Sequence, residues 1–201
     1  MSTAPAQTIL ETDSTRLLKA VRALLQEKGL VTLDDIQERQ AFTDGASPGQ
    51  GARMVARAWV DPAYRAEMLE DGTKAAETMG IPMRGMPPLG VLENTPDLHN
   101  LVVCTLCSCY PRAVLGYPPF WYKSAAFRAR AVRDPRGLLA EEWKTVIPDT
   151  VKLRVVDSTA DYRWMVLPMR PSGTAGWDEA KLASIVREGD MIGVTVPLGQ
   201  G

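Results

Sequence analysis

All three cysteines of the chain lie within one stretch of six residues, Cys104-Thr-Leu-Cys107-Ser-Cys109. A disulfide-rich fold spreads its cysteines along the chain, because each disulfide joins segments that are distant in sequence. Three clustered thiols cannot do this. The chain must therefore fold around a hydrophobic core, for which 201 residues are ample, and its cysteines are left for chemistry.

The charge and hydropathy of the chain exclude several classes of protein. It carries 23 Lys and Arg against 24 Asp and Glu, a formal net charge of −1, whereas a nucleic-acid-binding or membrane-binding face needs an excess of positive charge. No stretch of about 18 apolar residues could span a membrane, and the first residues lack the basic and apolar segments of a secretory signal. We therefore expect a soluble, cytoplasmic protein that binds neither nucleic acid nor a membrane.

The first part of the chain predicts a helical arm. At residues 14–29 the apolar side chains fall on one helical stripe, and a second short helix with a capping pattern is expected at about residues 32–40. A loop rich in glycine, serine and proline follows at residues 43–51. We place a boundary in this loop and expect an N-terminal helical arm at residues 1–46 and one domain at residues 47–201.

The domain predicts helices interspersed with short strands. Ser-Pro and Asp-Pro pairs mark helix starts, and alternation of apolar and polar residues marks strands. We expect helices at 47–60, 61–72, 73–80, 124–133, 135–143 and 178–187, strands at 101–103, 151–155, 162–167 and 191–196, and an irregular segment at 81–90. The predicted fold class is α+β, a layered α/β/β/α-like globular body with helices outside a small, mostly antiparallel sheet arrangement.

The spacing of the cysteines suits a metal ion. A Cys-x-x-Cys sequence places two sulfur atoms on one side of a tight turn, and Cys109 brings a third sulfur to the same point. Structural zinc sites and iron–sulfur clusters usually take four protein ligands, but the chain has no second cysteine pair, and His99 on the incoming strand is not placed to complete a tetrahedron. Further ligands would come from solvent, substrate or the backbone, where the amide nitrogens of Ser108 and Cys109 are candidates.

Three interpretations of the cluster are open at this point. The thiols could be buried and inert, as free cysteines often are. Cys104 and Cys107 could form a redox pair with a spare thiol. The cluster could also hold a metal with one open position, the arrangement of a catalytic rather than a structural site. The spacing favours metal binding and does not identify the metal.

A longer pattern surrounds the cluster. It begins with Val103-Cys-Thr-Leu-Cys-Ser-Cys-Tyr110 and continues at residues 115–123, 127–130, 132–136, 166–174, 176–177 and 191–194, with further segments before the cluster at residues 56–62 and 71–73. Over about residues 50–196 the chain resembles the alpha subunit of nitrile hydratase. The resemblance implies a lyase that hydrates a nitrile to the amide at a bound metal ion.

The resemblance also implies a ligand set. Cys104, Cys107 and Cys109 would donate sulfurs, and Ser108 and Cys109 would donate backbone amide nitrogens, to one ion per chain. In this family the second cysteine is oxidised to a sulfinic acid and the third to a sulfenic acid, states that would fall on Cys107 and Cys109. Thr105 occupies a position that carries Thr in cobalt members and Ser in iron members, so the resemblance implies low-spin cobalt, Co(III).

A mechanism and partners follow from the same resemblance. The ion would polarise a bound nitrile, and the oxygen on Cys109 would act on the nitrile carbon as nucleophile or as a base toward water. Cys109, Ser108 and Cys107 are the expected catalytic residues. A beta subunit, which can be divided into two chains, would supply arginines to the oxidised cysteines, and a cobalt-inserting activator protein would load the ion. The chain is therefore expected to be active only with its partner.

Other residues have two interpretations each. Trp121 matches a tryptophan of the family's substrate pocket, or it packs in the core. Arg163 and Asp161 match an arginine and an acidic neighbour near the family's active site, or they form a cross-strand ion pair. His99 is expected to be structural or at the surface. The arginines at positions 128, 130, 133 and 136 are expected on solvated or interface faces of helices.

One segment departs from the family. Where many members carry a glutamine of the active-site network, shortly before the metal motif, this chain has Arg84-Gly-Met-Pro-Pro-Leu-Gly90. Because that glutamine is absent, we expect a pocket for a bulky or heteroaromatic nitrile. Two alternative functions are the cobalt-binding subunit of a thiocyanate hydrolase, which shares the cysteine motif, and a non-catalytic metal-carrying or redox-sensing subunit.

Overall fold

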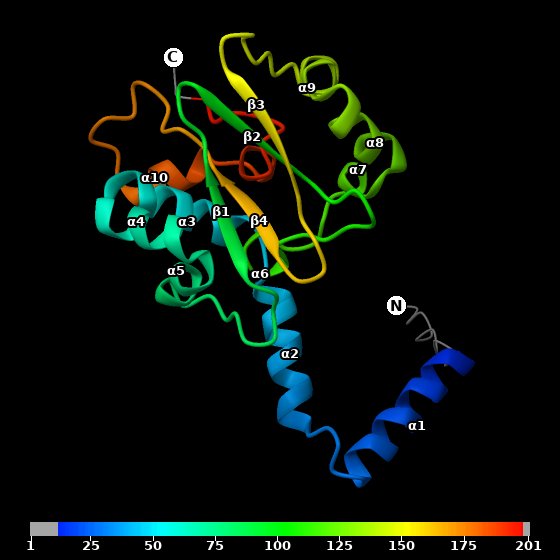
Figure 1. The fold of residues 1–201 in the computed structure, drawn as a ribbon. Helices are drawn as coiled ribbons and strands as arrows, with labels where there is room; N and C mark the ends of the chain where they lie inside the picture. Colours follow the sequence, from blue (N-terminus) through cyan, green and yellow to red (C-terminus); the bar gives the residue numbers. More distant parts are fainter. Residues whose placement is uncertain (1–11, 199–201) are drawn as a thin grey trace, which may run out of the picture. The chain divides into compact units, whose positions relative to one another are not determined.

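The computed structural model describes residues 12–198, which divide into two compact units, one that ends at Asp44 and one that begins at Gly45 (Figure 1). The first unit consists of two helices, α1 (Asp13–Glu27) and α2 (Leu33–Gly45). The second contains four strands and the remaining helices. This mixture of helices and strands confirms the predicted α+β class.

The two helices of the first unit begin at capping side chains. The hydroxyl of Thr12 accepts a hydrogen bond from the amide of Thr15, and Thr32 and Asp35 cap α2 reciprocally, each side chain accepting from the other's backbone amide. Helix α2 continues to Gly45, five residues past the predicted end. Neither helix has a buried residue. The apolar stripe predicted for α1 is therefore exposed within the chain, at Leu17, Leu18, Val21 and Leu24.

Four short strands form the centre of the second unit. These are β1 (Leu89–Glu93), β2 (Leu98–Val103), β3 (Lys152–Asp157) and β4 (Arg163–Leu167). The strands predicted at 101–103, 151–155 and 162–167 are confirmed as β2, β3 and β4, with ends that differ by three residues or fewer. Strand β1 was not predicted. It starts at the end of the Pro/Gly-rich segment and has no alternation of polar and apolar residues, because four of its five residues are buried.

The strands form two parallel pairs, so the prediction of a mostly antiparallel arrangement is wrong. β1 pairs with β4 and β2 pairs with β3, each in parallel register. Alternation indicates which face of a strand is buried but not which strand lies beside it. Although β1 and β2 follow one another in the chain, each takes its partner from the last third of the sequence.

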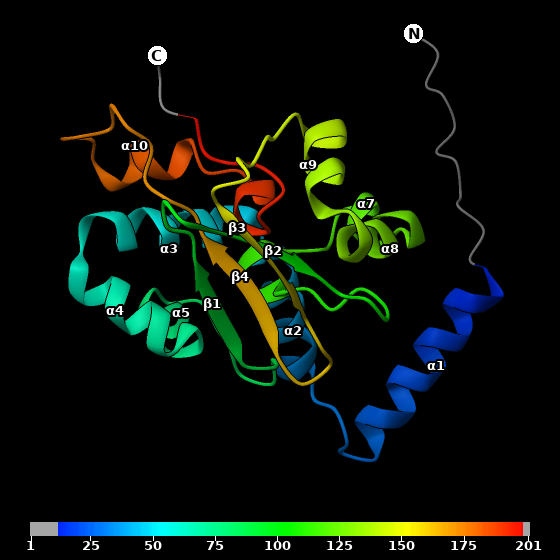
Figure 2. The ribbon, with the colours of Figure 1, turned by 45° about the horizontal axis from the view of Figure 1, so that its top comes forward.

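Helices cover the strands on both sides (Figures 1 and 2). Helices α3 (Pro48–Val60), α4 (Pro62–Glu70), α5 (Gly72–Thr78) and α10 (Glu179–Ser184) lie on one side, and α7 (Phe120–Lys123), α8 (Ala125–Arg133) and α9 (Pro135–Trp143) lie on the other. The helix starts predicted at 61, 124, 135 and 178 are confirmed, because the side chains of Asp61, Ser124, Asp134 and Asp178 accept hydrogen bonds from the first turns of their helices. Asp71, which the prediction placed inside the helix at 61–72, instead caps α5. The result is the predicted layered body, with its core at fully buried residues such as Met54, Leu101, Leu139 and Met165.

The segment predicted as a strand at residues 191–196 is not a strand. A short 3-10 helix, η1 (Glu188–Met191), leads into a turn at Gly193. The turn packs directly on β2, where the amide of Val102 donates to the carbonyl of Ile192. Gly193 has a φ of +87°, and a Cβ there would overlap the carbonyl oxygen of Asn100. The apolar residues around this glycine are buried by a turn rather than by a ladder of strand hydrogen bonds.

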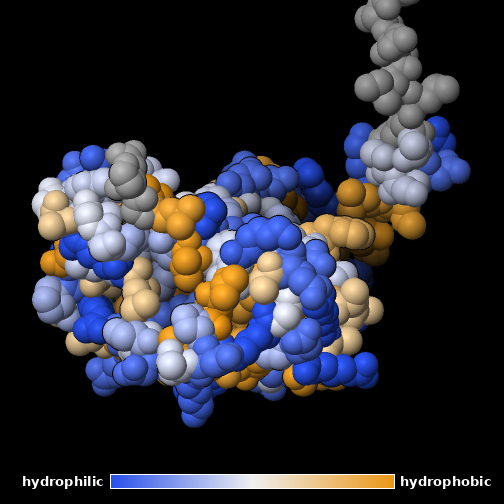
Figure 3. All heavy atoms as spheres, turned by 90° about the horizontal axis from the view of Figure 1, so that it is seen from above, coloured by the Kyte–Doolittle hydropathy of each residue, from blue (hydrophilic) through white to orange (hydrophobic). Residues whose placement is uncertain are grey.

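Apolar side chains also remain exposed on the second unit. Leu106 in the cysteine segment and Phe120 at the start of α7 are 87% and 86% exposed. Figure 3 shows apolar residues between polar ones on the face seen from above. Among the helices of residues 12–198, none is long and apolar enough to cross a membrane.

Candidate metal centre

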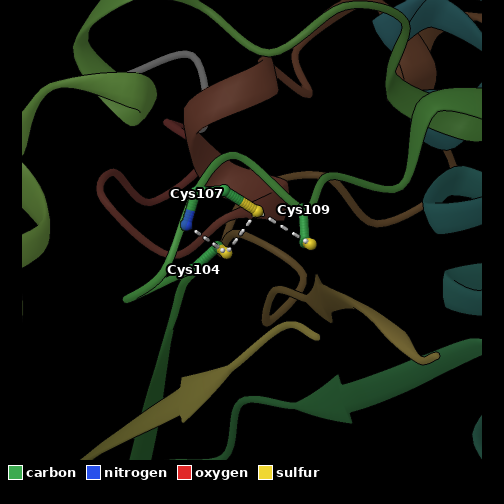
Figure 4. Close-up of side chains that lie close together, drawn as sticks. All are labelled: Cys104, Cys107 and Cys109. Atoms are coloured by element: carbon green, nitrogen blue, oxygen red, sulfur yellow. Dashed lines mark hydrogen bonds between the residues drawn. The ribbon is translucent and has the colours of Figure 1, made fainter. Parts of the chain in front are cut away.

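The three cysteines lie in the loop that leaves the C-terminal end of β2, which we call the cysteine loop (residues 104–109). Their sulfur atoms converge, with 3.6 Å between those of Cys104 and Cys107 and 3.4 Å between those of Cys107 and Cys109 (Figure 4). All three sulfurs are within 4.8 Å of one another. The amide of Cys107 donates to the sulfur of Cys104 at 3.2 Å, which closes the turn that the Cys-x-x-Cys spacing predicts.

The three thiols differ in exposure and in acidity. Cys104 and Cys109 are buried, whereas Cys107 is exposed. The pKa of Cys107 is lowered most by a hydrogen bond from Cys109 and next by a hydrogen bond from the backbone amide of Ser108. Burial, followed by the hydrogen bond to Cys107, raises the pKa of Cys109 to about 12. Of Cys107 and Cys109, Cys107 is therefore the thiol that ionises more readily.

Side chains from three other elements hold the backbone of the cysteine loop. Asp157, at the end of β3, accepts hydrogen bonds from the amide of Thr105 at 3.0 Å and from its hydroxyl at 2.5 Å. The guanidinium of Arg128 in α8 donates to the carbonyl of Cys107 at 2.8 Å. The hydroxyl of Tyr122 in α7 donates to the carbonyl of Cys109 at 2.9 Å.

The residue that follows the loop anchors it to the C-terminal part of the chain. The hydroxyl of Tyr110 donates to Glu188 of η1 at 2.6 Å, and its ring packs edge-on against Tyr122 with 4.9 Å between ring centroids. Burial raises the pKa values of both Tyr110 and Glu188. Tyr110 therefore serves as a protonated donor to a half-buried carboxylate.

Arg163, the first residue of β4, lies close enough to the cluster for its charge to lower the pKa of Cys109 against the larger effect of burial. Its Nη1 atom is buried and has no hydrogen-bond partner within residues 12–198. Asp161 is exposed in the preceding loop, and no ion pair joins it to Arg163 in the described part of the chain. The two residues are adjacent to one strand rather than on facing strands, so the cross-strand pair considered for them does not form.

Trp121 belongs to an aromatic cluster rather than to the cysteine loop. Its ring packs edge-on against Phe127 and Trp143, with 4.9 Å and 5.0 Å between ring centroids. It also lines a cavity of about 440 Å³ between α7, α8 and α9, together with Arg130 and Glu142. None of the three cysteines lines this cavity.

Four arginines of α8 and α9 were predicted on solvated or interface faces, and Arg133 is exposed as expected. Arg128 was expected on a solvated or interface face, but it binds the cysteine loop, and Arg136 donates to the carbonyls of Ile147, Pro148 and Val151. Sequence reasoning also missed the contacts of Asp157 and Tyr122. The spacing of these residues carries no signal of their contacts, because the loop and its partners meet only in the folded chain.

His99 has the structural role that was predicted for it. It is buried, and its Nε2 lies 2.8 Å from the carbonyl oxygen of Gly193. Burial lowers its pKa, and the hydrogen bond with Gly193 opposes that effect. The imidazole thus joins β2 to the turn after η1 and lies outside the sulfur cluster.

The donor set of the cysteine loop fits a metal ion. Three sulfurs from one short loop converge with distances between them that are too long for a disulfide bond. Among the described residues, no other group of three or more His, Cys, Asp or Glu side chains converges in this way. Sulfur ligands select soft or borderline transition metals. Fold and site together define an α+β protein with a cluster of three cysteines that could hold a metal ion.

The family of this chain follows from its similarity to known proteins. The nitrile hydratase alpha-chain family matches residues 12–195, and the chain belongs to this family. It is 50% identical over 181 residues to the low-molecular weight cobalt-containing nitrile hydratase subunit alpha of Rhodococcus rhodochrous, which covers 90% of this chain and 87% of the relative. It is also 42% identical over 205 residues to the thiocyanate hydrolase subunit gamma of Thiobacillus thioparus, which covers 96% of this chain and 84% of the relative.

Solved structures agree with this assignment. A recombinant thiocyanate hydrolase with partially modified cobalt centres aligns with a TM-score of 0.81 and 42% identity, over 93% of this chain and 91% of that one. A double mutant of the Fe-type nitrile hydratase from Comamonas testosteroni Ni1 aligns with a TM-score of 0.77 and 39% identity, over 92% and 90%. The resemblance predicted from the sequence is confirmed, as is the fold that it implied.

Proposed function

We propose that this chain is the alpha subunit of a cobalt-dependent nitrile hydratase, which converts a nitrile to the amide and is active only with its partner subunit. The observation that carries the proposal is the convergence of three sulfurs within 4.8 Å in a chain of the nitrile hydratase alpha family. Thr105 and the 50% identity to a cobalt-containing relative support cobalt over iron.

The proposed ligands are the sulfurs of Cys104, Cys107 and Cys109 and the backbone amide nitrogens of Ser108 and Cys109, for one Co(III) per chain. When bound, the ion supplies Lewis acidity that polarises a nitrile at its open position. The chain itself would hold the five donor atoms in one loop of six residues, so that a single loop provides every protein ligand.

Cys107 and Cys109 are the proposed sites of oxidation, to a sulfinic and a sulfenic acid. The lowered pKa of Cys107 and its exposure favour its oxidation, because the thiolate is the form that reacts. The oxygen on Cys109 is the proposed group that acts on the nitrile carbon. Arg163 supports this role, since its buried Nη1 atom has no hydrogen-bond partner in the described residues and could donate to an oxygen on the neighbouring sulfur. Asp161 is proposed to contribute only through its position two residues before Arg163 in the sequence.

The proposed substrate is a bulky or heteroaromatic nitrile. Trp121 is proposed to line its pocket, although the cavity that it lines within the described residues includes no cysteine. The segment that lacks the family glutamine contributes Met86, Pro87 and Leu89 to the lining of a small cavity, which Arg163 also lines. Methionine side chains adapt to irregular ligands more readily than an amide does. The comparison to make is turnover of 3-cyanopyridine against acrylonitrile, and much faster turnover of acrylonitrile would contradict this part of the proposal.

A beta subunit, as one chain or two, is the proposed partner, and a cobalt-inserting activator is the proposed source of the ion. The exposed apolar residues of α1 and the exposed Leu106 and Phe120 support a partner, since apolar patches of this kind usually mark interfaces. The oxidised cysteines also need cationic donors beyond Arg163, and the partner's arginines would supply them.

The test is intact-mass and metal analysis of the chain purified with its partner and activator from cobalt-supplemented cells. One cobalt and three added oxygen atoms per chain, with amide formed from a nitrile, are expected. Zinc with unmodified cysteines under the same conditions would refute the proposal and leave the non-catalytic metal or redox subunit.

A thiocyanate hydrolase subunit is the second candidate. The observation that favours it is the 42% identity to thiocyanate hydrolase subunit gamma across 96% of this chain. The two functions differ in product, because thiocyanate hydrolysis releases carbonyl sulfide and ammonia whereas nitrile hydration yields an amide. Release of carbonyl sulfide from thiocyanate by the assembly, without amide formation from nitriles, would select this candidate.

A further inference from the structure

The cysteine loop is held at three points by side chains that are not ligands. Asp157 comes from β3, Arg128 from α8 and Tyr122 from α7, and each binds a backbone group of the loop or the hydroxyl of Thr105. The three anchors are separated from their loop partners by 52, 21 and 13 residues in sequence, so that they tie the loop to the folded body.

The contacts are distributed along the loop. Asp157 binds Thr105, between the first and second cysteines, and Arg128 binds the carbonyl of Cys107, the oxygen of the peptide unit whose nitrogen belongs to Ser108. Tyr122 binds the carbonyl of Cys109, at the loop's end. The groups bound are a hydroxyl, one amide and two carbonyls, none of which is a proposed ligand atom. All three contacts are therefore compatible with a loaded site and with an unloaded one.

The strengths of the anchors differ with their surroundings. Tyr122 is fully buried, so loss of its hydroxyl would leave the Cys109 carbonyl without its donor in the protein interior. Asp157 is exposed but makes two hydrogen bonds from one carboxylate to one residue. Arg128 also donates to the carbonyl of Lys123, so it joins the loop to the end of α7.

We propose that Tyr122, Asp157 and Arg128 are positioning residues that set the shape of the cysteine loop before the ion arrives, so that cobalt meets a preorganised site. For the identity of the ion, the inference rests on the proposed function. Residues that orient metal ligands from outside the ligand set commonly change metal affinity by about 10–100-fold when they are replaced. Preorganisation lowers the cost of ordering the loop when the ion binds.

The test uses the full-length chain, made in cobalt-free medium and kept reduced, with three variants and a matched control for each. Tyr122→Phe, Asp157→Asn and Arg128→Gln remove the anchoring groups. Tyr117→Phe, Asp149→Asn and Arg133→Gln make the same chemical changes at exposed positions, the last of them in the same helix as Arg128. Two quantities are measured. The first is the hydrogen-exchange rate of the backbone amides at residues 104–109 without metal. The second is the affinity for Co²⁺, from a titration with Co²⁺ alone that is monitored by sulfur-to-cobalt charge-transfer absorption.

Each anchor variant is expected to exchange the loop amides faster than its control and to bind Co²⁺ about tenfold or more weakly, while the exchange of core amides in β2 and β4 increases by a smaller factor than that of the loop. A role in general stability alone would instead accelerate exchange in the loop and in the core by the same factor. Loop exchange and Co²⁺ affinity equal to those of the controls would overturn the inference, even if the wild-type assembly hydrates nitriles. An assembly without hydratase activity would overturn the proposed function, whereas a faster-exchanging loop in the variants would still support the anchors.

Discussion

Gly193 provides a sharp test of how the C-terminal segment packs on β2. A Cβ at this position would overlap the carbonyl oxygen of Asn100 and lie 2.9 Å from its carbonyl carbon and 3.2 Å from the Cα of Leu101. All three are backbone atoms of a central strand, so no side-chain rotation can relieve the overlap. Gly193 also has a φ of +87°, where residues other than glycine are strained.

Three effects add up in the variant Gly193→Ala. The left-handed backbone conformation costs an alanine about 1–2 kcal/mol. Steric overlap with a packed strand adds about 1–3 kcal/mol. Separating Gly193 from β2 also weakens the hydrogen bond between its carbonyl and His99, worth about 1 kcal/mol. The free energy of unfolding should therefore fall by about 3–6 kcal/mol, a large share of the stability of a typical domain.

Gly80→Ala is the matched control. Gly80 has a φ of +74°, but a Cβ at this position would meet no atom of the described chain within 4 Å beyond its sequence neighbours, so only the backbone strain of about 1–2 kcal/mol applies. Urea unfolding of both variants, followed by circular dichroism, gives the two free energies. If Gly193→Ala loses no more stability than Gly80→Ala, the packing of this turn on β2 is not as described.

Three further predictions concern the core, the pH dependence and the metal. Asp190 is fully buried and accepts hydrogen bonds from the amide of Arg187 at 2.8 Å and the hydroxyl of Thr195 at 2.5 Å. Asp190→Asn should therefore lower the free energy of unfolding by about 2 kcal/mol. If Asp190→Asn is as stable as the exposed-site variant Asp97→Asn, this prediction is wrong. Burial lowers the pKa of His99 in the folded chain. The neutral imidazole should therefore stabilise the fold fully above the unfolded pKa of about 6.5, and this stability should be lost as the pH falls through the lower folded pKa. Urea unfolding at several pH values should show a smaller change of the unfolding free energy with pH in His99→Gln than in the wild type. Cys104→Ala should leave the purified assembly without cobalt by elemental analysis, and wild-type cobalt content in this variant would remove Cys104 from the ligand set.

Helix starts were predictable from the sequence because capping is local. Asp61, Asp134 and Asp178 each accept hydrogen bonds from amides two or three residues further on, so the signal and the structure it forms lie within one turn. The predicted helix at 135–143 agrees with α9 at both ends. The same holds for the Cys-x-x-Cys turn, whose closing hydrogen bond joins Cys107 to Cys104.

Strand partners were not predictable because they depend on contacts between distant segments. β2 and β3 pair although four helices lie between them in the chain, and nothing in the pattern of either strand specifies a parallel neighbour. The turn at Gly193 was mistaken for a strand for the same reason. Its apolar residues are buried against β2, and burial alone does not distinguish a strand from a turn that crosses one.

For the candidate site, the donor atoms were predictable and their surroundings were not. The positions of Cys104, Cys107 and Cys109 follow from six consecutive residues. The anchors Asp157 and Arg128 are ordinary charged residues of a strand end and a helix, and only folding brings them to the loop.

The parallel register of β2 and β3 has a consequence for the order in which the site can form. Val103 pairs with Asp157, so the strand ends meet at one edge, and the cysteine loop obtains its Thr105 contacts from a residue synthesised 52 positions later. During translation, the cysteines leave the ribosome well before the carboxylate that holds their loop. The fully anchored site therefore forms only after Asp157 has been made and β3 has paired with β2, so a metal ion that binds the anchored loop must bind after that pairing.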